Sequence, residues 1–145
     1  VRGLKKNNPN EQKIRLEITE TSLAAIGENH TRMLMHLKEN GAEILLDDFG
    51  SGYSSFGMLQ DYDFDILKMD ISFVRNIGVN KKSESILRAI IDMAHQLEIR
   101  LVAEGAETEE QVAFLRENGC DYIQGYYYYK PMPEAEFLQL LEEGK

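Results

Sequence analysis

Tryptophan is absent from this chain, and cysteine occurs once, at Cys120. A single cysteine excludes an internal disulfide and a cysteine-based metal cluster, and it is typical of a reducing compartment, so we expect a cytoplasmic location. His30, His36 and His95 are scattered along the chain, which argues against a histidine-based site. No apolar run reaches the roughly 18 residues of a membrane span and no signal-peptide pattern is present, so we expect no membrane contact by this segment.

Positive charge is also scarce. Sixteen lysines and arginines face 25 aspartates and glutamates, which gives a formal net charge of -9. Non-specific binding to a nucleic-acid polymer needs clustered basic residues, so this balance excludes that class of function. A small phosphate ligand stays compatible, because bound metal ions reverse the local field. With 145 residues, 43% hydrophobic and 28% charged, the chain is typical of one soluble domain with its own core.

Short apolar segments alternate with amphipathic ones, and this alternation predicts an α/β fold with a parallel sheet. Gly41 and Gly119 follow two expected helices as C-terminal caps, and Thr108 to Gln111 has the pattern of a capping box. The expected strands are residues 14–18, 43–48, 65–70, 100–104 and 121–124; the expected helices are 30–40, 54–59, 83–97, 108–115 and a last one from Pro133 that turns Phe137, Leu138 and Leu141 inward.

Each expected strand ends in a polar or charged residue where a core strand would stay apolar. These residues are Glu17, Asp47 with Asp48, Lys68 with Asp70, Glu104 and Gln124. In α/β folds the carboxyl ends of parallel strands form the binding face, so we expect these side chains to converge on one mouth. Two adjacent carboxylates ~4 Å apart at an effective dielectric of about 20 repel by roughly 4 kcal/mol, so a proton, a cationic side chain or a metal must offset Asp47 and Asp48.

The acidic set supplies only oxygen ligands, which suits Mg²⁺ or Mn²⁺ rather than zinc. Enough carboxylates are present for two ions that share one of them, and such a pair stabilises the attacking and leaving oxygens of a phosphoryl transfer. Gly50 and Gly52 allow a tight loop beside the acids. Lys68 and Asp70 project to the same face of their strand. Two interpretations of Lys68 stay open: it holds the attacking water or the phosphate, or it only neutralises the acids as a buried ion pair.

Five segments in register resemble a known family. They are LEITE at 16–20, DDFGSGYSS at 47–55, LKMD at 67–70, VAEGAET at 102–108 and QGY at 124–126. Their order and spacing closely resemble the EAL-type cyclic-di-GMP phosphodiesterases of bacteria over nearly the whole chain. The resemblance implies a modified (β/α)8 barrel that hydrolyses one phosphodiester of cyclic di-GMP to linear pGpG with Mg²⁺ or Mn²⁺. Residues 1–145 would then form a single truncated domain with about the last five βα units of this TIM-like barrel.

The resemblance also implies roles for individual residues. Glu17 and Asp47 resemble ligands of the first metal, with Asp47 bridging, and Asp48 resembles a ligand of the second metal. Glu104 resembles an acid at the metal centre that takes part in catalysis. Lys68 resembles the residue that positions or deprotonates the attacking water.

Other positions match residues placed around that centre. Gln124 resembles a residue that orients the attacking water. Glu20 resembles the anchor of the glycine loop 49–55, which in the family links substrate binding and dimer contacts. Glu107 resembles a further acid near the site, and Asp70 belongs with these outer residues.

The chain also departs from the family pattern. The Glu-Ala-Leu segment that names the family and a downstream metal-binding asparagine are absent, and the chain begins at Val1. A barrel takes ~250 residues, so we expect that the first strands were removed or not observed, or that another chain, as in a homodimer, covers the open edge at 14–18. The isolated chain is expected to have little or no activity. Parent proteins of this family often carry a diguanylate-cyclase-like or sensory domain, and some are attached to the membrane.

Two other classes of function are considered. A non-catalytic module that binds cyclic di-GMP or a partner protein would share these motifs, and the Glu-Ala-Leu segment would decide between them. A receiver domain also has five strands, an acidic pair and a late Lys-Pro, which Lys130-Pro131 imitates. Receivers carry the acidic pair on the first strand, whereas here it ends the second, and the fourth strand ends in Glu104 rather than a hydroxyl residue. The enzyme domain is therefore favoured.

Overall fold

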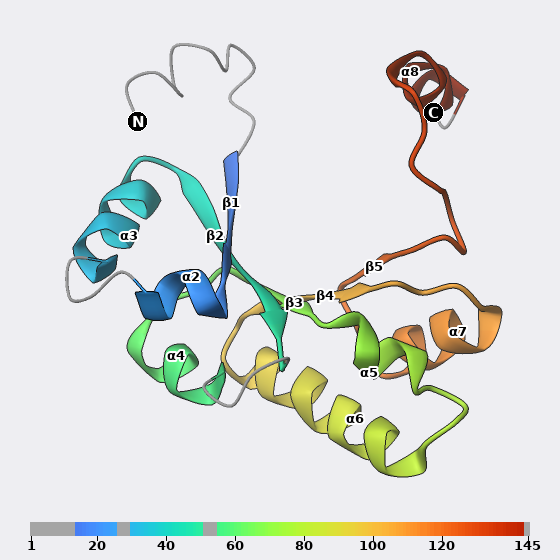
Figure 1. Ribbon diagram of the computed structural model, residues 1–145, viewed down its shortest axis with the longest axis horizontal. Helices are drawn as coiled ribbons and strands as arrows, with labels where there is room; N and C mark the ends of the chain where they lie inside the picture. Colours follow the sequence, from blue (N-terminus) through green and yellow to red (C-terminus); the bar gives the residue numbers. More distant parts are fainter. Residues whose placement is uncertain (1–13, 26–29, 51–54, 144–145) are drawn as a thin grey trace.

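The computed structural model describes residues 14–25, 30–50 and 55–143, and Figure 1 shows their arrangement. Strands and helices alternate along most of the chain, as the sequence predicts. In order they are β1 (Ile14–Thr19), α2 (Glu20–Ala25), α3 (His30–Glu39), β2 (Ala42–Phe49), α4 (Ser55–Asp61), β3 (Ile66–Met69), α5 (Ile71–Arg75), α6 (Lys81–Gln96), β4 (Arg100–Glu104), α7 (Glu109–Glu117), β5 (Tyr122–Gln124) and α8 (Glu134–Glu143). None of the described helices is long and apolar enough to cross a bilayer.

The five strands form one parallel sheet in the order β1-β2-β3-β4-β5. Neighbours in the chain are thus neighbours in the sheet, which is the order of strands around a (β/α)8 barrel. A receiver domain would place its strands in the order 2-1-3-4-5. The topology therefore confirms the α/β barrel-like prediction and excludes the receiver alternative.

One face of the sheet packs against the helices, which Figure 1 shows on one side of the strands from α2 to α7. Successive side chains of a strand point to opposite faces, so every second residue joins this core. The strand residues in the core are Ile44, Leu46, Phe49, Leu67, Met69, Leu101 and Ala103, and the main helical ones are Leu87, Ile90, Ile91, Ala94, Val112 and Leu115. The site residues Glu17, Asp47, Lys68 and Glu104 alternate with residues that pack in or against this core, so they point to the opposite face.

The sheet curves around this opposite face. In a flat sheet the outer strands of five would lie roughly 19 Å apart, given about 4.8 Å between neighbours. In this structure the guanidinium carbon of Arg15 in β1 lies 5.9 Å from the ring centre of Tyr122 in β5. Glu43 in β2 binds both Arg15 and Arg100 of β4 at 3.0 and 2.9 Å. These contacts between distant strands indicate the curvature of a partial barrel.

Helix α7 begins with the capping box that the sequence predicts. The Thr108 side chain accepts a hydrogen bond from Gln111 N, and the Gln111 side chain accepts one from Thr108 N. Because Thr108→Ala leaves a backbone donor unsatisfied, we expect it to lower the free energy of unfolding by about 1 kcal/mol in urea denaturation. Thr108→Ser keeps the hydroxyl and serves as the control. Equal stability of the two variants would contradict this role.

The structure differs from the expected elements in several places. Helices α2 and α5 are too short to give an apolar repeat, and neither was predicted. The expectation that Phe137, Leu138 and Leu141 turn inward is wrong, because these side chains are 49 to 52% exposed. Figure 1 shows the reason, since an extended segment after β5 carries α8 away from the sheet. The apolar pattern of α8 predicted a helix correctly but not a covering surface.

Candidate metal and phosphodiester site

Acidic side chains from three strands surround one amine at the carboxyl end of the sheet. The Nζ atom of Lys68, in β3, lies 3.4 Å from Asp47 Oδ1 in β2 and 3.4 Å from Glu104 Oε2 in β4. Glu17 Oε2, in β1, lies 3.9 Å from the same atom. The Lys68 side chain is only 12% exposed, so it fills the space between these strands. The predicted convergence of strand ends is therefore present for these four residues.

The charge of Lys68 is stabilised by this surrounding. Burial lowers the pKa of the ammonium, but the charges of Asp47, Glu104 and Glu17 together outweigh it, and the pKa is raised above its usual value. Lys68 is therefore a cation at neutral pH in this arrangement. It can hold a phosphate oxygen or a water, whereas a role as proton acceptor would need a lowered pKa.

A bulge in β2 places the two adjacent aspartates. Leu46 pairs with Leu67 and Phe49 with Met69, so three steps in β2 face two steps in β3. Asp48 has a φ of 58°, in the left-handed region that only a few residue types enter easily, and its N–H donates to Asp47 Oδ1 at 3.0 Å. Asp47 consequently faces Lys68, while Asp48 is exposed at the rim.

The other predicted site residues lie around this centre with different contacts. Asp70 caps α5, its side chain accepting from Ser72 N at 2.8 Å. Gln124 pairs in register with Glu104, and its backbone carbonyl accepts from Gly105 N and Ala106 N. Glu107 is exposed. Glu20 opens α2, but its side chain and residues 51–54 of the glycine loop lie outside the described part, so its role as loop anchor stays a prediction.

The chemistry of these side chains suits a hard divalent cation, because Glu17, Asp47 and Glu104 offer only carboxylate oxygens as ligands. The three carboxylates also approach a common point. Their common neighbour in this arrangement is the Lys68 ammonium. Within the ranges that the structure describes, no three acidic, histidine or cysteine side chains already stand as ligands of one ion. A bound metal would therefore share these carboxylates with Lys68.

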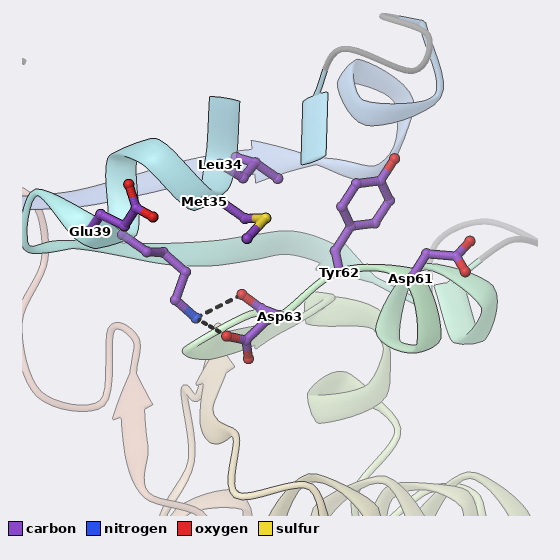
Figure 2. A pocket seen from close by; sticks show the side chains of 7 residues that line it. Leu34, Met35, Glu39, Asp61, Tyr62 and Asp63 are labelled. Atoms are coloured by element: carbon purple, nitrogen blue, oxygen red, sulfur yellow. Dashed lines mark hydrogen bonds and ion pairs between the residues drawn. The ribbon is translucent and has the colours of Figure 1, made fainter. Parts of the chain in front are cut away.

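Two features at the opposite end of the sheet were missed by sequence reasoning. One is the ion-pair group of Arg15, Glu43 and Arg100, in which Glu43 is the buried member; Glu43 lies four residues before Asp47, on the same strand face, and that alternation was the available signal. The other is a cavity of about 400 Å³ between α3 and the segment after α4. Figure 2 shows its lining, with the amine of Lys38 bound to Asp63. This cavity lies at the amino ends of the strands, away from Lys68.

Comparisons with known proteins agree with this fold. The model of the EAL domain family matches residues 2–131. "Cyclic di-GMP phosphodiesterase NbdA" of Pseudomonas aeruginosa is 41% identical over 88% of this chain, which spans only 16% of that relative's length. The crystal structure of the EAL domain of Mycobacterium smegmatis DcpA has a TM-score of 0.84 and 38% identity, covering 90% of this chain and 59% of that one.

A further solved structure carries a metal and a nucleotide. It is a manganese/cy-diGMP complex of Klebsiella pneumoniae BlrP1, with a TM-score of 0.72 and 31% identity, covering 77% of this chain and 29% of that one. The family match extends over most of the chain, and the fold agrees with it. This chain belongs to the EAL domain family.

Proposed function

We propose that this chain is part of a metal-dependent phosphodiesterase that hydrolyses cyclic di-GMP to linear pGpG. The observation that carries the proposal is the Lys68 ammonium within 3.4 to 3.9 Å of carboxylates from three parallel strands. A site with oxygen ligands and one fixed cation suits a reaction in which negative charge develops on a phosphodiester. The name of NbdA and the nucleotide in the BlrP1 complex support cyclic di-GMP as the substrate.

The position and charge of each site residue indicate its proposed role. Glu17, Asp47 and Glu104 would hold a first Mg²⁺ or Mn²⁺, and Asp48, exposed beside Asp47, would reach a second. Such ions, when bound, make hydroxide available near neutral pH and neutralise charge on the phosphate. Lys68 stays protonated because its pKa is raised, so it orients the attacking water or a phosphate oxygen.

Two further residues complete the proposed assignment. Gln124, in β5, is the register partner of Glu104 in the neighbouring strand β4, and it is exposed to solvent. In this position its side chain would orient the attacking water. Glu107, three residues beyond Glu104, is also exposed and would be an additional acid near the bound ions.

The proposed function also includes a strand partner for β1 and a cellular location. β1 is an edge strand in the described sheet, so we propose that another polypeptide strand, from a second copy or from additional residues of the same protein, pairs with it. Without that strand the first metal lacks ligands, and the chain alone should turn over little cyclic di-GMP. A bacterial cytoplasmic location belongs to the same proposal and is supported by the single cysteine. A diguanylate-cyclase-like or sensory domain in the same protein is proposed from the family resemblance alone.

The test measures binding and turnover separately. Cyclic di-GMP is titrated with Mn²⁺ into the natural full-length protein by calorimetry, and pGpG formation is followed in the same protein. Asp47→Asn should weaken binding about tenfold and lower turnover at least about 100-fold, because a shared ligand loses its charge. Asp63→Asn, an acid at the other end of the sheet, should change neither. Full turnover by Asp47→Asn would refute the mechanism, and binding without any pGpG would favour a non-catalytic module.

A further inference from the structure

Helix α5 contacts the backbone on both sides of the proposed site. A Cβ atom placed on Gly50, which follows β2, would lie 2.5 Å from Cε2 of Phe73. A Cβ on Gly105, which follows β4, would overlap Cγ1 and Cδ1 of Ile71. Both glycines have positive φ, 90° and 79°, so their backbones approach α5 in conformations that suit glycine. Each contact leaves no room for a side chain.

The geometry of the sheet explains why one short helix reaches both loops. β3 lies between β2 and β4, and α5 begins two residues after β3 ends. Ile71 and Phe73 are two positions apart, so they point in different directions around the helix. Figure 1 shows α5 at the end of β3, on the side of the sheet where α6 and α7 also lie.

The helix is also firmly attached to the sheet. The Asp70 side chain caps it through Ser72 N at 2.8 Å, and Asp70 N donates to Phe49 O at 3.3 Å. Val74, on its inner side, is fully buried in the core. If the backbone at either glycine pushes on α5, the packing of the helix against the core resists the displacement, so α5 does not simply move aside.

Each glycine contact is next to an acid of the site. Gly50 follows Asp48 by two residues, and Gly105 directly follows Glu104. Gly105 N and Ala106 N both donate to Gln124 O, at 2.8 and 3.1 Å, which extends the connection to β5. The backbone segments that set the positions of these acids thus meet through two side chains of α5.

We propose that Ile71 and Phe73 are positioning residues that couple the backbone after Asp48 to the backbone after Glu104. Through them, a shift of the backbone at Gly50 changes the placement of Glu104 and the distance between the carboxylates around Lys68. The relevance to catalysis rests on the proposed function, whereas the coupling itself can be measured without any ligand.

The test uses hydrogen exchange of backbone amides in a double-mutant design. Gly50→Ala pushes a methyl group against the Phe73 ring and should raise exchange at Gly105 and Ala106 about tenfold. Phe73→Ala in the same chain makes room for that methyl group and should return exchange at these two amides to within about twofold of the Phe73→Ala single variant, whereas the strain of alanine at a φ of 90° stays at position 50 itself. An effect confined to the β2 side, or one that persists in the double variant, would overturn the proposal.

Two more variants keep the result decisive if Gly50→Ala fails to fold. Phe73→Leu replaces the ring by a smaller apolar side chain and so loosens the contact with Gly50. This variant should raise exchange at Gly105 and Ala106 about threefold. Val74→Ala destabilises the same helix from its core side, is not the residue nearest to either glycine, and should raise exchange only in proportion to its loss of global stability. Identical exchange patterns in these two variants would overturn the coupling.

A ligand experiment separates this inference from the proposed function. Mn²⁺ and cyclic di-GMP are titrated into the natural full-length protein and into the same variants made in it, and Phe73→Leu should weaken binding about fivefold while Val74→Ala leaves it unchanged. If the unmutated full-length protein binds neither ligand, the proposed function fails, and the exchange measurement still decides the coupling. If the ligands bind and Phe73→Leu binds as tightly as the parent, the positioning role is wrong.

Discussion

Replacing Lys68 with methionine is expected to lower the free energy of unfolding by about 2 kcal/mol at neutral pH. Methionine keeps an apolar stem but removes the ammonium that contacts Asp47, Glu104 and Glu17. The three carboxylates then lack a cation and repel one another. Glu17 is 56% exposed and can turn toward water, which keeps the loss below that of a fully buried charge. Urea denaturation at pH 7 measures the change.

The same substitution should make the protein more responsive to divalent cations. A cation that binds only the folded state raises stability in proportion to the logarithm of its concentration above Kd. In Lys68→Met the carboxylates no longer share their charge with an ammonium, so Mn²⁺ should raise the Tm by several degrees more than in the parent. Lys38→Met is the matched control, because Lys38 binds Asp63 and Asp65 at the opposite end of the sheet. An equal response in both variants would contradict a site at Lys68.

The pH dependence has a definite sign. The pKa of Lys68 is raised in the folded protein, since the carboxylates outweigh the effect of burial. Its contribution to stability is therefore complete below the unfolded value of about 10.4 and is lost as pH rises through the higher folded value. The stability difference between the parent and Lys68→Met should stay constant up to about pH 10 and shrink above it. A difference that already disappears near pH 8 would show that Lys68 is not the protonated centre.

The strand-end site could be predicted from sequence because it depends on two regular properties. Parallel strands bring their carboxyl ends to one edge, and side chains alternate between faces. The observed register pairs Thr19 with Asp47 and Glu104 with Gln124, so residues at the ends of successive strands lie at similar heights. Local apolar pattern therefore sufficed to find Glu17, Lys68 and Glu104 as neighbours.

Features that depend on one backbone angle or one distant partner could not be predicted in this way. The left-handed Asp48 follows from a mismatch between β2 and β3, which no local pattern reports. Helix α5 was missed because five residues held by the Asp70 cap give no helical period. Glu43 was read only as the start of a strand, since its partners Arg15 and Arg100 lie 28 and 57 positions away.

Glu43→Ala is expected to lower the free energy of unfolding by about 1.5 kcal/mol, because two hydrogen bonds to charged groups are lost while the side chains of Arg15 and Arg100, 52 and 35% exposed, can turn to water. Glu43 is 5% exposed and binds Arg15 Nε at 3.0 Å and Arg100 Nη2 at 2.9 Å. The hydrogen bond to Glu43 is the main cause that raises the pKa of Arg100, so this guanidinium loses most when the carboxylate is removed. Glu43→Gln keeps an acceptor and should lose about half as much in urea denaturation.

The loss should be concentrated in β1, because the Arg15–Glu43 pair fastens this edge strand at its amino end while β2 alone pairs with it in the described sheet. Hydrogen exchange in Glu43→Ala should therefore rise more in β1 than in the central strand β3. Glu39→Ala, an exposed acid on α3, should stay within about 0.5 kcal/mol of the parent and serves as control. Glu17 lies two residues beyond Arg15, so a loosened β1 would also displace an acid from Lys68 at the far end of the sheet. Uniform exchange across the sheet would instead mean that Glu43 stabilises the fold as a whole and leaves Glu17 in place.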